Sequence, residues 1–178
     1  MEAVELDQVL QQNSEQTDQY LTFIMADEEY GVDILRVQEI RGWENVTPIP
    51  NAPPHIKGVI NLRGTIVPII DLRQRFGLSK AEYGPLTVVI VLKVNTRKGS
   101  RVMGIVVDAV SDVYSLSADE MREAPDLGDN VNTSYIRGLV NVANKMVILL
   151  DINELLGGDT IPEVSAAALG EIKHMSGH

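Results

Sequence analysis

The sequence contains no cysteine. Disulfide bonds, thiolate zinc sites, C-x-x-C redox motifs and a cysteine nucleophile are therefore excluded together. A chain without cysteine also fits a reducing compartment.

Basic and aromatic residues are also few. Lys and Arg number 15 against 25 Asp and Glu, a formal net charge of −10, and the aromatic residues are one Trp, five Tyr and two Phe. Binding of nucleic acid needs a basic stripe, and small barrels that bind single strands add aromatic side chains to it. We therefore expect no nucleic-acid partner, and the acidic charge indicates cationic or mixed-charge protein partners.

Long hydrophobic runs are missing. The longest, such as Val88–Leu92 and Met146–Leu150, are far shorter than the ~20 residues that span a bilayer. The first 19 residues are polar and acidic, without the basic start and apolar core of a signal peptide. We expect a cytoplasmic protein that does not insert into the membrane directly.

Recognisable catalytic motifs are missing as well. The sequence has no G-x-x-x-x-G-K-[ST], G-x-G-x-x-G or G-x-S-x-G pattern. His174 and His178 have a helical ligand spacing but no third ligand nearby, and Asp126–Asn132 lacks the spacing of a calcium loop. A triad assembled from distant residues stays open at this point. We expect no catalytic residue, no metal site and no cofactor.

What the sequence has in abundance is β-branched residues, with 21 Val and 16 Ile. These side chains suit a pleated sheet and crowd a helix. Short apolar runs between Gly, Pro, Asn and Asp predict a barrel or a sandwich. A flexible acidic N-terminal tail (1–19) and a C-terminal tail (159–178) are expected to flank it. The expected strands are Tyr20–Met25, Tyr30–Ile34, Ile66–Ile70, Thr87–Val94, Arg101–Val107 and Lys145–Leu150.

An internal repeat is the strongest pattern in the chain. His55–Leu78 aligns without gaps with Tyr135–Gly158 at an offset of 80, and six of 24 positions are identical. Upstream, Tyr30–Ile40 aligns with Met103–Val113 at an offset of 73. The repeat predicts two β subdomains, residues 20–83 and 84–158. Because units of roughly 70 residues are marginal as separate cores, we expect a shared buried seam that also offers a groove for a partner.

Both repeat units end with the same helix signals. Asp71 and Asp151 each precede a Gln or Glu by three residues, which predicts N-caps of short helices. A glycine then follows, placed for a left-handed C-cap. Ser117 with Glu120 predicts a capping box. The expected helices and their glycines are Leu72–Phe76 with Gly77 and Ile152–Leu156 with Gly157.

Positions where the two repeat units differ in chemistry are candidates for function. Arg63 aligns with Ala143, and a guanidinium present in one copy only can pair with a carboxylate or with backbone oxygens. The alternative is a solvated loop residue. Arg36, Glu39 and Arg41, with aliphatic residues between them, indicate either a docking edge or an edge strand protected by charge.

Three segments resemble the CheW family of bacterial chemotaxis coupling proteins. They are EEYGVDILRVQEIRGW (28–43), HIKGVINLRGTIVPIIDLRQRFG (55–77) and VMGIVVDAVSDV (102–113). The resemblance covers Tyr20–Gly158, nearly the whole compact part, and its motifs are long. It implies an all-β fold of two tandem SH3-like five-stranded β-barrels with short helices, which agrees with the repeat.

By this resemblance the chain is expected to be a non-enzymatic adaptor or scaffold. It would couple methyl-accepting chemoreceptors to the histidine kinase CheA in arrays at the inner face of the membrane. The implied partners are the regulatory CheW-like domain of CheA, the cytoplasmic tips of chemoreceptors and further copies of the chain in rings. The implied contact residues are Val37, Glu39, Gly58, Arg63, Gly104, Val110 and Val113.

Three alternatives accompany this reading. One is a coupling protein of a paralogous pilus-motility or other chemosensory system, which would show the same motifs. Another is a small-barrel binder of a ligand or nucleic acid, which the net charge disfavours. The third is a hydrolase built on an unrecognised triad.

Overall fold

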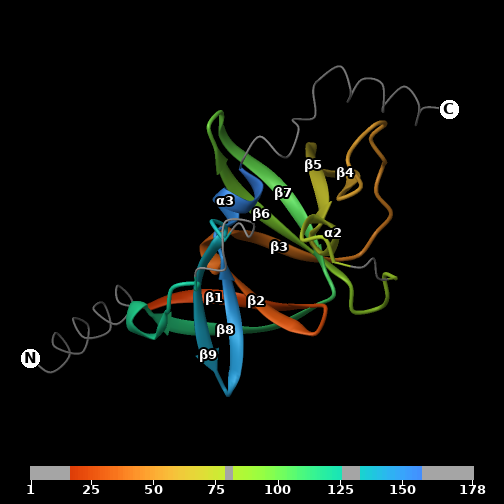
Figure 1. Ribbon diagram of the computed structural model, residues 1–178. Helices are drawn as coiled ribbons and strands as arrows, with labels where there is room; N and C mark the ends of the chain where they lie inside the picture. Colours follow the sequence, from red (N-terminus) through yellow and green to blue (C-terminus); the bar gives the residue numbers. More distant parts are fainter. Residues whose placement is uncertain (1–16, 79–81, 126–132, 158–178) are drawn as a thin grey trace, which may run out of the picture.

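The computed structural model describes residues 17–78, 82–125 and 133–157 (Figure 1). No helix in these ranges is long and apolar enough to cross a membrane. In chain order the elements are β1 (Thr17–Met25), β2 (Glu28–Asp33), η1 (Ile34–Arg36), β3 (Val37–Gly42), β4 (Ile56–Leu62), β5 (Thr65–Asp71), α2 (Leu72–Arg75), β6 (Val88–Thr96), β7 (Gly99–Val107), β8 (Ala109–Ser117), η2 (Ala118–Glu120), β9 (Ile136–Val142), β10 (Lys145–Leu150) and α3 (Ile152–Leu156).

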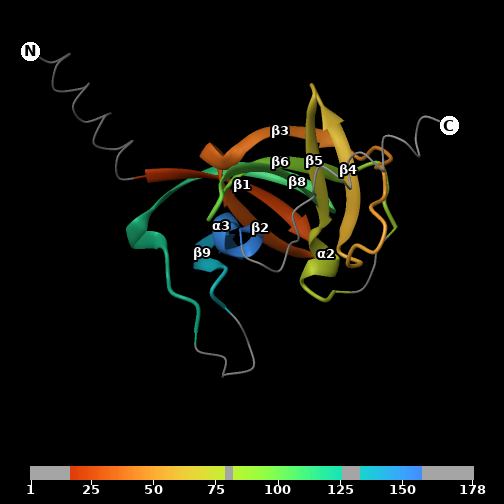
Figure 2. The ribbon, with the colours of Figure 1, turned by 90° about the horizontal axis from the view of Figure 1, so that it is seen from above.

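Two five-stranded sheets build the fold, seen from two directions in Figures 1 and 2. Barrel 1 has the strand order β3-β6-β7-β5-β4, and barrel 2 has β8-β1-β2-β10-β9. Single bridges, Thr47 with Val59 and Arg122 with Leu139, return the chain after an edge strand to the opposite edge. The predicted all-β class with two five-stranded SH3-like barrels is confirmed.

The two barrels are not consecutive in the sequence. The hairpin β1–β2 belongs to barrel 2 and the hairpin β6–β7 to barrel 1, so each barrel joins a hairpin from one half to three strands from the other. The predicted division into barrels at 20–83 and 84–158 is therefore wrong. The crossings are short, because η1 alone leads from β2 into β3 and Asp108 alone separates β7 from β8. The repeat shows which segments are alike, but not which copy each hairpin pairs with.

Three apolar clusters fill the fold. One draws only on barrel 1 and another only on barrel 2, while the largest takes side chains from both sheets and forms the predicted seam. Strand β6 shows why its sequence is almost continuously apolar. Val89 and Val91 face the barrel 1 cluster, whereas Ile90, Leu92 and Val94 face the seam. Since apolar side chains fill the seam, a partner can reach only its rim.

Equivalent glycines in the two barrels leave room for a side chain of the neighbouring strand. A Cβ on Gly31 would lie 2.8 Å from Cδ2 of Leu149, and a Cβ on Gly104 would lie 2.7 Å from Cδ1 of Ile69. Each pair joins parallel neighbouring strands, β2 with β10 and β7 with β5. The repeat therefore preserves close strand packing and not only local sequence.

The predicted N-caps of the two α-helices are confirmed. Asp71 Oδ1 accepts the N–H of Gln74 at 3.3 Å, and Asp151 Oδ1 accepts the N–H of Glu154 at 3.2 Å. Each cap satisfies one of the backbone donors that a helix leaves unpaired at its start. The helices α2 and α3 consequently begin where the sequence predicts.

The other predicted caps have mixed outcomes. Gly77 has a φ of +73°, as a left-handed cap requires. Gly157 has a φ of −88°, so the prediction is wrong there; a Cβ would lie 2.4 Å from the carbonyl oxygen of Asn153, which explains the glycine by packing. The Ser117 hydroxyl bonds to the Glu120 carboxylate at 3.1 Å and caps no backbone N–H, because η2 is a single 3₁₀ turn.

Half of the aromatic residues stack in one column. Its members are Phe23 on β1, Tyr30 on β2, Phe76 after α2 and Tyr135 before β9, with successive ring centroids 5.9, 5.7 and 5.3 Å apart. Phe76 follows a barrel 1 strand and helix, whereas its two neighbours belong with barrel 2. The column therefore joins the two barrels. Each aromatic pair stabilises the fold by about 0.5–1.5 kcal/mol beyond the contribution of the apolar area that it buries.

Candidate protein-binding site

Four of the predicted contact residues lie on two strands that are equivalent in the repeat. Val37 and Glu39 are on β3, and Val110 and Val113 are on β8. Both are edge strands, β3 beside β6 and β8 beside β1. An edge strand is open to a partner on its outer side. The structure thus divides the predicted contacts between the two barrels.

Glu39 is the centre of an ion-pair network on barrel 1. Its Oε2 lies 2.9 Å from Nη1 of Arg63, and its Oε1 lies 3.7 Å from Nη1 of Arg41. Arg41 also bonds to Glu44 at 3.3 Å. The Glu39 side chain is 22% exposed and the Arg63 side chain 79%, so an anchored carboxylate holds a guanidinium that faces solvent. Arg36, the third member of the predicted charged cluster, lines a separate cleft that is described below.

A tight turn between β4 and β5 presents Arg63. Arg63 and Gly64 both have positive φ, +51° and +88°, and Asn61 Oδ1 accepts the N–H of Gly64 at 2.8 Å. Positive φ at two successive residues is the geometry of the favoured two-residue hairpin turn. Ala143 and Asn144 adopt it in the equivalent turn, with φ of +51° and +66°. The two copies share the turn and differ in the side chain that it presents.

Two of the predicted contact residues are buried glycines. Gly58 has a φ of +146°, and a Cβ there would lie 2.1 Å from the carbonyl oxygen of Thr47. A Cβ on Gly104 would meet both Ile69 and Val89 within 3 Å. These positions fix how closely strands approach beneath the surface, so a side chain there would deform the barrel.

Barrel 2 carries exposed aliphatic side chains. Val113 is 44% exposed, Met146 53% and Ile24 36%, whereas Val110 is half-buried against the seam. A hollow of about 390 Å³ with three carboxylates and one ammonium adjoins them. It is lined by Ile24, Asp27, Glu28, Glu29, Ser111, Lys145 and Met146. Apolar contact area with a charged rim is the usual anatomy of a protein interface.

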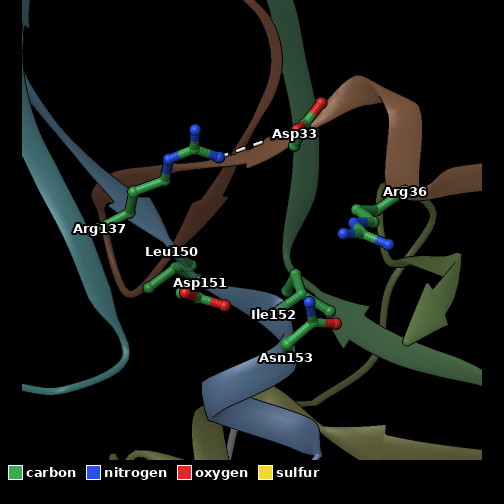
Figure 3. Close-up of a pocket in the computed structure, with 7 residues that line it drawn as sticks. All are labelled: Asp33, Arg36, Arg137, Leu150, Asp151, Ile152 and Asn153. Atoms are coloured by element: carbon green, nitrogen blue, oxygen red, sulfur yellow. Dashed lines mark ion pairs between the residues drawn. The ribbon is translucent and has the colours of Figure 1, made fainter. Parts of the chain in front are cut away.

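A cleft that the sequence did not reveal opens where β2, η1, β9, β10 and α3 meet (Figure 3). Its volume is about 210 Å³. Its lining residues come from distant segments, which is why no sequence pattern marks it; the one signal is that Lys57 and Arg137 align as cations in the repeat. The lining residues are Asp33, Arg36, Arg137, Leu150, Asp151, Ile152 and Asn153.

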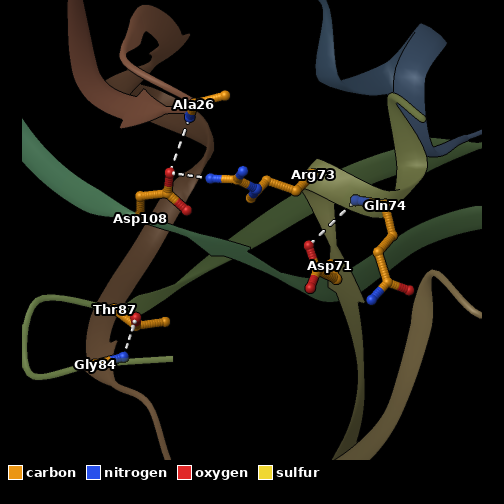
Figure 4. Close-up of polar contacts among 7 residues, drawn as sticks. All are labelled: Ala26, Asp71, Arg73, Gln74, Gly84, Thr87 and Asp108. Atoms are coloured by element: carbon orange, nitrogen blue, oxygen red, sulfur yellow. Dashed lines mark hydrogen bonds and ion pairs between the residues drawn. The ribbon is translucent and has the colours of Figure 1, made fainter. Parts of the chain in front are cut away.

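An ion pair fixes the crossing from β7 to β8 (Figure 4). Arg73 Nη1 lies 2.9 Å from Asp108 Oδ2, and the same oxygen accepts the N–H of Ala26 at 2.9 Å. The N–H of Asp108 in turn donates to the carbonyl of Ile24 at 3.0 Å. Helix α2, the β1–β2 turn and the crossing are therefore tied at one carboxylate.

Perturbed titratable groups lie in packed positions. Burial, and then a hydrogen bond to Asp71, raise the pKa of the Tyr83 hydroxyl. Burial, and then the nearby Arg75 charge, lower the pKa of His55. Within the part of the chain that the structure describes, no cluster of three or more metal-ligating side chains occurs. The edge strands, the ion-pair network and the exposed aliphatic residues are features suited to binding a protein surface.

Comparison with known proteins agrees with this description. The model of the CheW-like domain family matches residues 19–159, which include both barrels. A chemotaxis protein CheW of Klebsiella aerogenes is 50% identical over 150 residues, covering 84% of this chain and 88% of the relative. A chemotaxis protein CheW of Rhizobium meliloti is 38% identical over 135 residues, covering 76% and 84%.

A solved structure gives the same result for the fold. The scaffolding protein TtCheW of Thermoanaerobacter tengcongensis superposes with a TM-score of 0.72 at 29% sequence identity. The match covers 83% of this chain and 93% of that protein.

Proposed function

The chain belongs to the CheW-like domain family and is a chemotaxis adaptor, and from this premise we propose that it couples chemoreceptors to the histidine kinase CheA. One surface would hold the cytoplasmic tip of a receptor, and another the regulatory CheW-like domain of the kinase. Receptor signals would then shift the population of kinase geometries that are competent for catalysis. The chain itself supplies contacts and no catalytic step.

The setting of this activity follows from the partners. The adaptor acts in the cytoplasm, at the inner face of the membrane, where receptor arrays gather it. Further copies of the chain in rings are part of the proposal, since each copy presents edge strands on both barrels.

The ion pair between Glu39 and Arg63 carries the proposal. It joins Glu39 on the edge strand β3 to Arg63 in the turn between β4 and β5, and Ile40, beside Glu39 in the sequence, is 44% exposed. The Glu39 carboxylate, 2.9 Å from the Arg63 guanidinium, holds it in a fixed direction. The guanidinium still has free N–H donors for a partner. Fixed charge of this kind sets orientation and specificity more than affinity.

The remaining predicted residues have distinct places in the proposal. Val37 and Glu39 on β3 form the barrel 1 contact with Arg63, and Val110 and Val113 on β8 form the barrel 2 contact. Gly58 and Gly104 support them from beneath, because the absence of a side chain lets neighbouring groups approach these two positions closely.

A pull-down tests the proposal. The wild type and an Arg63→Glu variant are incubated with soluble lysate and detergent-solubilised receptors, after circular dichroism has shown equal folding. The wild type is expected to retain both kinase and receptor, and the variant to lose one of them. Arg97→Glu is the matched control, because Arg97 is also an exposed arginine in a hairpin turn and gives the same change of charge.

The outcomes separate the possibilities. If the wild type retains neither partner, the proposed function is wrong. If Arg63→Glu retains both as well as Arg97→Glu does, the ion pair is not the contact. A wild type that retains the receptors and kinase of a pilus-motility system in place of a chemotaxis system would assign the chain to that paralogous pathway.

A further inference from the structure

The seam has two ends that are equivalent in the repeat, one at α2 and one at α3. The polar contacts at these two ends differ. Arg73 on α2 corresponds to Asn153 on α3, and Asp108 corresponds to Leu35. On the α2 side, Arg73 and Asp108 meet in an ion pair at 2.9 Å. On the α3 side, Asn153 Oδ1 accepts the N–H of Asn95 at 2.9 Å, and Leu35 is left 84% exposed. The cleft of Figure 3 is the opening that remains on that side.

The carboxylates of this cleft are already engaged. Asp33 Oδ1 accepts the N–H of Leu35 at 3.0 Å and so caps η1, and Asp151 caps α3. Arg137 lies 3.8 Å from Asp33 and 3.6 Å from Asp18, separations at which an ion pair is weak and solvated.

Arg36 is in a different position from Arg137. Among the residues that the structure describes, the Arg36 side chain has no hydrogen bond and no ion pair, although its guanidinium lines the cleft opposite Arg137 (Figure 3). A partly buried guanidinium without a counter-ion favours an incoming anion. The cleft therefore has one cation available for a ligand.

The surroundings define what kind of anion fits. The volume of about 210 Å³ is below the roughly 300–1,000 Å³ of pockets for small organic ligands, and it suits a single side chain. Leu150 and Ile152, both buried, form an apolar floor, and Leu35, on the same 3₁₀ turn as Arg36, is 84% exposed. A carboxylate and an apolar residue one turn apart on a helix would satisfy both.

We propose that this cleft binds a glutamate or aspartate side chain from a helical segment of the receptor, through Arg36, while Leu35 packs against an apolar residue one turn away. The inference rests on the proposed coupling function and names the chemistry of the receptor at this rim of the seam. Arg137 adds positive potential, and Asn153 adds a side-chain donor at the cleft wall. Arg36 and Leu35 then determine which receptors the adaptor accepts.

Binding of a receptor cytoplasmic fragment and of the kinase regulatory domain, each measured by calorimetry with the full chain, tests the proposal. Arg36→Glu and Leu35→Ser are each expected to weaken receptor binding by about tenfold or more, the effect of losing a charged hydrogen bond or a buried aliphatic contact. Kinase binding is expected to stay within about twofold, since the cleft is not its site. Arg97→Glu is the control for charge, and thermal unfolding checks that each variant is folded.

A charge exchange adds a second readout. Acidic residues of the receptor fragment are changed one at a time to Arg, and one of them is expected to restore binding to Arg36→Glu. Equal receptor binding by Arg36→Glu and the wild type overturns the cleft while leaving the coupling function standing. Loss of kinase binding in place of receptor binding overturns the assignment to the receptor. A wild type that binds no receptor overturns both.

Discussion

At the scale of single residues, changes to the Glu39–Arg63 pair are expected to affect partner binding without affecting the stability of the fold. Because Arg63 is 79% exposed, Arg63→Glu is expected to change the free energy of unfolding by less than about 1 kcal/mol. The exchanged double variant Glu39→Arg/Arg63→Glu restores an ion pair with reversed direction. It is expected to fold as the wild type in urea unfolding and still to fail in the pull-down, because the partner reads the position of the guanidinium. Recovery of binding in the double variant would contradict a direct contact.

Arg63 also shows how far residues can be predicted from the sequence. The repeat singled it out because its counterpart is Ala143, and the turn geometry is the same in both copies. The partner Glu39 was among the charged residues expected at an edge. The cleft around Arg36 was not predictable, since Arg137, Asp151 and Asn153 reach it only through the pairing of sheets that the sequence does not specify.

His55 gives a pH dependence with a definite sign. Burial, and then the charge of Arg75, lower the pKa of the folded imidazole below its ordinary value of 6.5. The unfolded chain then binds more protons than the folded chain below pH 6.5, so stability is full above that pH and is lost as pH falls through the folded pKa. One proton limits the slope to about 1.4 kcal/mol per pH unit.

His55→Gln is expected to flatten that dependence. Urea unfolding of the wild type and the variant is compared at several pH values between 7 and 5, and the difference between the two curves isolates this residue from the carboxylates. Parallel curves would show that His55 has the same proton affinity in both states.

At the scale of elements, the two helix caps form a matched pair. The side chain of Asp151 accepts the N–H of Glu154, and Asp151→Ala removes this cap, so it is expected to cost about 1 kcal/mol of unfolding free energy. Asp71 is 3% exposed and also accepts the hydroxyl of Tyr83, so Asp71→Ala is expected to cost about 2–3 kcal/mol. Tyr83→Phe in both backgrounds measures the hydroxyl's share, followed by urea unfolding. Equal costs for the two aspartates would remove the role assigned to Tyr83.

The elements that the sequence missed share one property. The six expected strands correspond to β1, β2, β5, β6, β7 and β10, whereas β3, β4, β8 and β9 are the four edges of the two sheets. A strand with a neighbour on one side only needs fewer apolar residues, and β3 alternates half-buried and exposed positions along its length. Apolar runs therefore reveal the sheet interiors, and the proposed partner contacts fall on the strands that they do not reveal.

At the scale of the whole molecule, the seam and the two units were predictable, but the exchange of hairpins was not. Hydrophobic pattern and repeat both say that two similar β units share a core. The pattern and the repeat do not predict whether β1–β2 pairs with β8–β10 or with β3–β5, because the local sequences are alike in the two halves. In the structure, the chain passes from one sheet to the other at the short crossings η1 and Asp108.

Hairpin exchange makes the halves interdependent, and this leads to a test by dissection. A fragment of residues 1–81 holds β1–β5, two strands of barrel 2 and three of barrel 1, so neither sheet is complete. The complementary fragment 82–178 is incomplete in the same way. Each alone exposes its share of the seam, including Leu92 or Phe23, and is expected to lack a cooperative unfolding transition. Mixed or co-expressed, the two are expected to associate and recover one.

Trp43 provides the measurement for this test. It is the only Trp, and its ring lies 4.3 Å from that of Tyr83, packed against a cluster that needs β6 and β7 from the other fragment. Its fluorescence should therefore report the native environment only when both fragments are present. If each half instead formed its own barrel, fragment 1–81 alone would unfold cooperatively in urea. In that case, only surface contacts would set the angle between the two barrels. When the hairpins are exchanged, the fold itself sets that angle.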